Sequence, residues 1–86
     1  MKEKMAEEIA LFITAEAVTN SIEGNWAVYL YEIANEFGIT EKEVENMSKD
    51  ILEELKCRNE ILDVYADEEK FDVDISTDYL EELEEY

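Results

Sequence analysis

Apolar residues in the first two thirds of the chain recur at steps of three and four, the period of one helix face. This spacing predicts a first helix over residues 2–21 and a second over 26–37, with Asn25 as the N-cap of the second. A third helix is expected from Thr40 to about Arg58, opened by a capping box of Thr40 and Glu43. Gly38 ends the second helix, because glycine takes the left-handed conformation that reverses the chain there.

The period then changes from about 3.6 residues to two, which is typical of strands. Leu62, Val64 and Ala66 alternate with polar neighbours, and the same pattern returns over residues 71–75 after the polar turn 67–70. These segments predict a β-hairpin with Leu62, Val64 and Ala66 on one face. Ser76 or Thr77 is expected to cap a short last helix.

The chain has 86 residues, of which 47% are apolar, so it predicts a single domain over 1–86 with one modest core. Its one cysteine permits no internal disulfide. No stretch approaches the ~20 apolar residues of a membrane span, and Glu7 and Glu8 interrupt what would be the basic region of a signal peptide. We therefore expect a cytoplasmic protein.

Negative charge is the most unusual property of the composition. Twenty-five acids stand against seven bases, which gives a net charge of −18. Residues 1–58 contribute −7, whereas residues 59–86 contribute −11 and contain one base, Lys70. Negative charge at this density opposes folding, because the acids repel one another. It therefore indicates either a solubilising surface or a cationic partner.

The stretch from Leu30 to Val44 resembles a helix-turn-helix. Ala34 is small where the next helix crosses, Gly38 takes the turn, and Ile39 and Val44 fill the angle between the helices. With the hairpin that follows, most of the chain resembles the winged helix-turn-helix superfamily. The resemblance implies an α+β fold, mainly α, with three helices, a two-stranded wing and a short C-terminal helix.

In DNA-binding proteins of this kind the third helix enters the major groove and the wing contacts the DNA backbone or minor groove. The groove-facing positions here would be Thr40, Glu41, Lys42, Glu45, Asn46 and Lys49. The wing tip would present Asp67, Glu68 and Glu69, although DNA affinity depends on neutralising phosphates. We therefore expect no direct binding to duplex DNA.

By size and charge alone, the chain is similar to phage-encoded DNA-mimic inhibitors of restriction, CRISPR or repair proteins. A globule of this length is expected to be roughly 30 Å across, and a duplex of that length carries on the order of 18 phosphate charges. The leading hypothesis is an acidic protein that occupies the nucleic-acid-binding surface of a basic partner, in the host cytoplasm if phage-encoded. Two alternatives stay open: a winged-helix transcriptional regulator that binds DNA, and an assembly adaptor that uses the winged-helix core as a platform.

The candidate partner-binding residues are acids of the hairpin, the C-terminal segment and the third helix. They are Asp63, Asp67, Glu68, Glu69, Asp72, Asp74, Asp78, Glu81, Glu82, Glu41 and Glu45. Val28 and Tyr31 fall off the inner stripe of the second helix and form a candidate apolar interface, either with a partner or in a homodimer. Burial of this pair under the first helix is the other interpretation.

No catalytic, cofactor or metal site is expected. The chain has no histidine for acid–base or nucleophilic chemistry, and its two glycines form no phosphate-binding loop. Asp72 and Asp74 resemble a carboxylate pair for a metal, but they are expected to point to opposite faces, as neighbouring strand residues do. We therefore expect a binding protein and not an enzyme.

Overall fold

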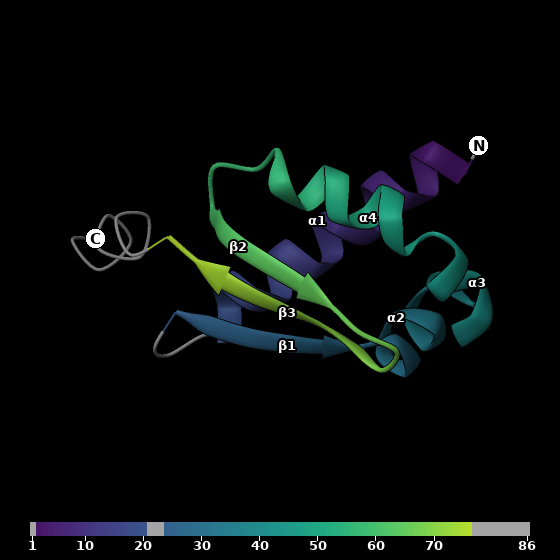
Figure 1. Ribbon diagram of the computed structural model, residues 1–86. Helices are drawn as coiled ribbons and strands as arrows, with labels where there is room; N and C mark the ends of the chain where they lie inside the picture. The colour runs from purple at the N-terminus through teal and green to yellow at the C-terminus, as the bar shows by residue number, and fades with distance from the viewer. Residues whose placement is uncertain (1, 21–23, 77–86) are drawn as a thin grey trace.

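The computed structural model describes residues 2–20 and 24–76 of the chain (Figure 1). These residues form a mainly helical α+β fold with four helices and a three-stranded antiparallel sheet. In chain order the elements are α1 (Lys2–Asn20), β1 (Asn25–Tyr29), α2 (Leu30–Phe37), α3 (Glu41–Asn46), α4 (Ser48–Lys56), β2 (Ile61–Ala66) and β3 (Lys70–Ile75). The predicted last helix lies outside the described residues.

The sheet has the order β1-β3-β2, so β3 lies in the centre and pairs antiparallel with both neighbours. The hairpin of β2 and β3 was predicted, but β1 was not: residues 25–29 were assigned to the second helix, with Asn25 as its cap. Five residues hold too little pattern to separate a helix from a strand. Pairing with β3, in which Val28 lies opposite Phe71, decides the conformation of this segment.

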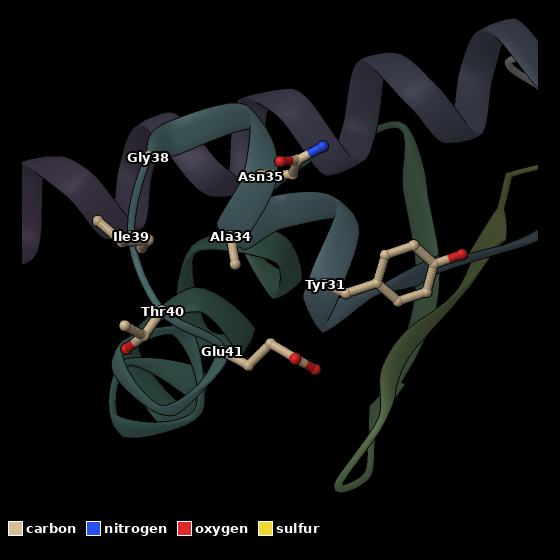
Figure 2. Close-up of a pocket in the computed structure, with 7 residues that line it drawn as sticks. All are labelled: Tyr31, Ala34, Asn35, Gly38, Ile39, Thr40 and Glu41. Carbon is tan, nitrogen blue, oxygen red and sulfur yellow. The ribbon is translucent and has the colours of Figure 1, made fainter.

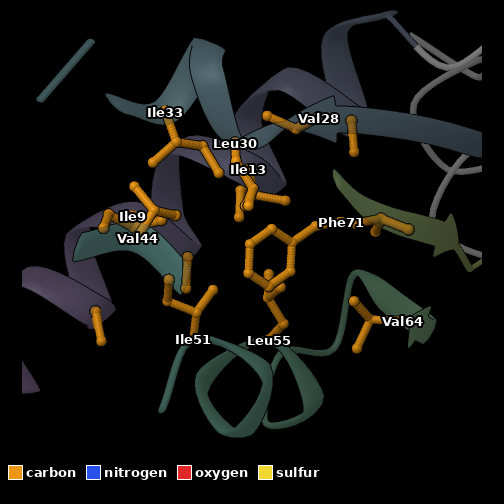
Figure 3. Close-up of a cluster of buried hydrophobic side chains, with 14 of the residues drawn as sticks. Ile9, Ile13, Val28, Leu30, Ile33, Val44, Ile51, Leu55, Val64 and Phe71 are labelled. Carbon is orange, nitrogen blue, oxygen red and sulfur yellow. The ribbon is translucent and has the colours of Figure 1, made fainter. Parts of the chain in front are cut away.

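The core lies between the inner face of the sheet and helices α1 and α4 (Figure 1). Phe71 of β3 is fully buried, and Figure 3 shows its ring among side chains that come from both helices and strands. α1 contributes Ile9 and Ile13, and α4 contributes Ile51 and Leu55, all of them without solvent exposure. The predicted helical stripes therefore supply most of this core.

The predicted junction between the second and third helices is confirmed. Gly38 caps α2 with φ 66° and ψ 34°, and the Ile39 N–H donates to the Ala34 carbonyl at 3.0 Å. Thr40 caps α3, its hydroxyl oxygen accepting from the Glu43 N–H at 3.1 Å. The Thr40 hydroxyl also donates to the Glu43 carboxylate at 3.2 Å, so this carboxylate contacts the Thr40 side chain and not its backbone N–H, and only the Thr40 half of the predicted capping box is present.

The single helix predicted over residues 40–58 is wrong, because it divides at Met47 into α3 and α4. Met47 has φ −96° and ψ 1°, and its N–H is shared between the Glu43 carbonyl at 3.3 Å, the α-helical partner, and the Val44 carbonyl at 3.0 Å, a bond one residue shorter. The bend leaves Val44, Met47 and Ile51 all buried.

Strand β2 contains a β-bulge that changes which residues face inward. Ile61 pairs with Ile75, but Asp63 pairs with Asp74, so Leu62 is the extra residue. Its side chain is 69% exposed, whereas Ile61 and Val64 are buried. The expectation that Leu62 shares a face with Val64 is therefore wrong, because the bulge shifts the two-residue alternation by one position.

Candidate functional site

The face of the sheet that points away from the helices carries three carboxylates. On β3, Phe71, Val73 and Ile75 are buried, so the alternating residues Asp72 and Asp74 point outward. Asp63 and Tyr65 of β2 lie directly opposite Asp74 and Asp72. Like charges in opposite positions of a sheet are destabilising, so this arrangement opposes stability.

Asn25 of β1 holds two of these carboxylates in place. Its side-chain Nδ2 donates to Oδ1 of Asp72 and to Oδ1 of Asp74, both at 2.7 Å. The two carboxylates therefore share a face, as residues i and i+2 of a strand must, and the expectation that they point to opposite faces is wrong. Among the described residues no group of three or more candidate ligands could hold a metal ion.

Asp63 is also engaged by its neighbours. Its Oδ2 accepts from the Tyr65 hydroxyl at 2.8 Å, and its Oδ1 accepts from the Val64 N–H at 2.9 Å. The hydrogen bond to Asp63, and then the negative charge of Asp63, raise the pKa of Tyr65. Tyr65 is 63% exposed, so the acidic face also presents a phenol ring to solvent.

The turn of the hairpin depends on Asp67. Its Oδ1 accepts from the backbone N–H groups of Glu69 at 2.7 Å and of Lys70 at 2.9 Å. These two hydrogen bonds lower the pKa of Asp67, because they stabilise the ionised carboxylate. The carbonyl of Glu69 accepts from the Leu30 N–H at 2.8 Å, which ties the turn to the start of α2.

The single base of the hairpin lies against an aromatic pair. The Nζ of Lys70 is 5.7 Å from the centre of the Tyr29 ring, within the range of a cation–π contact. Tyr29 in turn stacks on Tyr31, with ring centres 5.7 Å apart and an interplanar angle of 27°. Residues 61–76 thus contain six acids and one base, and that base lies at the end of the hairpin away from Asp63 and Asp74.

The other predicted site residues are distributed unevenly. Glu41 and Glu45 are exposed on α3, separate from the sheet face, and Asp78, Glu81 and Glu82 lie outside the described residues. Tyr31 is 58% exposed, but Val28 is fully buried on the inner face of β1. Val28 therefore cannot contribute to an apolar interface, because strand alternation turns it into the core.

Two surface depressions flank α2, and sequence reasoning missed both. One, of about 560 Å³, lies over the turn between α2 and α3 and is lined by residues that include Tyr31, Ala34, Gly38 and Glu41. Figure 2 shows the Tyr31 ring and the Glu41 side chain extending to the same side of this turn. The small residues Ala34 and Gly38 are a signal of open space, but the sequence prediction used Ala34 only as a helix-crossing position and Gly38 only as the turn. The second depression lies between α1, β1 and α2.

No protein-family model, curated protein or solved structure matches this chain significantly. What points to a function is therefore the geometry of the described residues. None of their helices is both long and apolar enough to cross a membrane.

Proposed function

We propose that this chain is an acidic binding protein that occupies the nucleic-acid-binding surface of a basic partner in the cytoplasm, as a DNA mimic does. The observation that carries the proposal is the outward face of β2 and β3, where Asp63, Asp72 and Asp74 lie together and Lys70 is the one base among residues 61–76. Burying Phe71, Val73 and Ile75 requires only that the alternate positions be polar, so three carboxylates on the outward face are not dictated by the fold.

We also propose that the fold is a winged helix whose wing has become acidic. The order of α2, the Gly38 turn, α3 with α4, and then the hairpin supports this relationship. In a winged helix that binds DNA the wing approaches phosphates, for which Lys and Arg are suited. Glu68 and Glu69 at the hairpin turn would repel phosphates. They favour a basic protein surface, of the kind that itself binds phosphates, as the partner.

Two matched variants test the proposal. For each, the affinity is measured for a partner protein that the parent chain captures. The hairpin variant replaces Glu68, Glu69, Asp72 and Asp74 with their amides, and Asp67 is left unchanged because it forms the turn. The helix variant replaces the exposed acids Glu7, Glu8, Asp50 and Glu53 on α1 and α4 with their amides, which removes the same charge. An amide keeps an acceptor oxygen, so the new side chains at positions 72 and 74 can still accept from Asn25.

We expect the hairpin variant to bind the partner at least about tenfold more weakly, or about 1.4 kcal/mol, and the helix variant to lose much less. Neutralised rim acids should mainly slow association, because complementary potentials act on encounter. Equal losses in both variants would show that total charge is sufficient and that the hairpin is not the site. No loss in either would leave the acids as a solubilising surface and favour the adaptor hypothesis.

A further inference from the structure

The depression between α1, β1 and α2 combines aromatic walls with carboxylates. It has a volume of about 320 Å³. Its aromatic lining is Phe12, Trp26 and Tyr31, and its acids are Glu16, Glu32 and Glu36. No lysine or arginine is among the described residues that line it. We propose that this pocket binds the guanidinium group of an arginine side chain from the partner protein.

The aromatic walls are held by contacts outside the pocket. Phe12 packs edge-to-face on Phe37, with ring centres 5.8 Å apart and an interplanar angle of 86°. Tyr31 stacks on Tyr29, and Trp26 is half-buried on β1, where it pairs with Val73. Partly exposed aromatic rings that are already held in position suit a flat cation, because their side chains lose little conformational entropy when the cation binds.

The carboxylates keep capacity to accept hydrogen bonds. Oε2 of Glu16 accepts from the Asn20 side chain at 2.9 Å, and Oε2 of Glu32 accepts from the Tyr29 N–H at 3.2 Å. Each uses one oxygen in these bonds, so the second oxygen of each can accept from a ligand. A guanidinium group has five N–H donors in a planar fork, which suits several carboxylates beside a ring better than an ammonium group does.

Local electrostatics of α2 also favour a cation here. Glu32 and Glu36 are four residues apart on one helix, where like charges repel, and Glu36 lies in the last turn, where the helix dipole disfavours an acid. The last turn of α2 contains no base to offset these effects. A bound guanidinium would offset both the repulsion between Glu32 and Glu36 and the unfavourable interaction of Glu36 with the helix dipole. The inference rests on the proposed function for its protein partner, but the pocket's chemistry can be measured without that partner.

Trp26 is the only tryptophan of the chain, so its fluorescence reports directly on this pocket. The probes are three blocked tripeptides, Gly-Arg-Gly, Gly-Lys-Gly and Gly-citrulline-Gly; citrulline has nearly the shape of arginine but no charge. We expect a saturable change with the arginine peptide, a weaker one with the lysine peptide and none with the citrulline peptide. A signal that rises without saturation, or is equal for arginine and citrulline, would overturn the proposal.

Variants localise the effect. Tyr31→Ala and Glu36→Gln should each weaken arginine-peptide binding by about threefold or more, the size of one exposed cation–π or ionic contact. Glu8→Gln removes the same charge from an exposed position of α1 outside the pocket and should leave binding unchanged. Equal weakening by Glu36→Gln and Glu8→Gln would show a bulk-charge effect and no pocket. Circular dichroism checks that each variant is folded.

The two proposals fail in different ways. If the arginine peptide does not bind but the hairpin variant has reduced affinity for the partner, the pocket assignment is wrong and the proposed function stands. If the peptide binds as expected but the hairpin variant keeps its affinity for the partner, the pocket stands and the hairpin is not the principal contact.

Discussion

At the scale of single residues, acids that look equivalent in the sequence have different physical roles. Asp67 accepts two backbone N–H groups and forms the turn, whereas Asp72 and Asp74 share the amide of Asn25. Glu68 is simply exposed at the turn. Charge patterning identified the hairpin as acidic, but these roles depend on contacts such as the one between Asn25 and Asp72, which are 47 residues apart.

Replacing Asp67 with alanine should lower the melting temperature more than replacing Glu68 with alanine, because only Asp67 satisfies backbone donors of the turn. Since folding lowers the pKa of Asp67 from its ordinary value of 3.8, its stabilising effect is present above that value and is lost as pH falls through the folded-state pKa. Thermal melts of both variants between pH 2 and pH 7 check this. A difference in melting temperature between the two variants that stays the same at low pH would contradict this role of Asp67.

At the scale of whole elements, the sequence predicted what depends on local pattern. The extent of α1, the Gly38 turn, the Thr40 cap and the hairpin all follow from periodicity or from backbone preference. Strand β1 was missed because its conformation comes from pairing with β3, about 45 residues later in the chain. The bulge at Leu62 was missed for a similar reason: it is defined by register against Ile75 and Asp74.

The same dependence on distant contacts explains which parts of the candidate site were predictable. The acids of the outward face were predicted from the sequence, because the two-residue alternation of a hairpin exposes one of its two sets of side chains. The depression that contains Phe12, Trp26 and Tyr31 could not be named, because α1, β1 and α2 each contribute one wall. Val28 was offered as an interface residue only because its segment was taken for a helix.

The bulge makes a sharp prediction for two neighbouring residues. Leu62→Ser should change the free energy of unfolding by less than about 0.5 kcal/mol, because the side chain is 69% exposed. Ile61→Ser should cost about 3 kcal/mol, because it removes a buried side chain and places a hydroxyl in the core. Urea denaturation of the two variants measures both values. The reverse order would mean that β2 pairs without the bulge.

At the scale of the whole molecule, charge and shape act together. The radius of gyration is 12.5 Å, close to the value of about 12 Å expected for this length, but the extents are 39 × 20 × 20 Å. A duplex 39 Å long carries about 23 phosphate charges. Residues 2–20 and 24–76 contain 19 acids and 7 bases, a net charge of −12, so the described part of the chain has about half the linear charge density of DNA along its long axis.

Such charge should make the stability of the free chain rise with salt. Screening shortens the reach of each charge to about 8 Å at 0.15 M salt and 3 Å at 1 M, which weakens repulsion between acids on separate elements. We expect the melting temperature to increase when sodium chloride is raised from about 0.02 M to about 0.5 M, a range over which the screening length falls several-fold. The hairpin variant should show a smaller increase than the parent chain. A melting temperature that falls with salt would mean that attractive ion pairs, and not repulsion, dominate this surface.

Displacement of proteins from DNA tests the central claim most directly. A duplex-DNA resin is loaded with a bacterial lysate, and the chain is added at constant ionic strength, beside polyglutamate of equal total charge. We predict that the chain releases a specific DNA-binding protein that polyglutamate leaves on the resin, and that the hairpin variant releases much less of it than the helix variant does. Release of nothing, or of the same proteins that polyglutamate releases, would contradict the account.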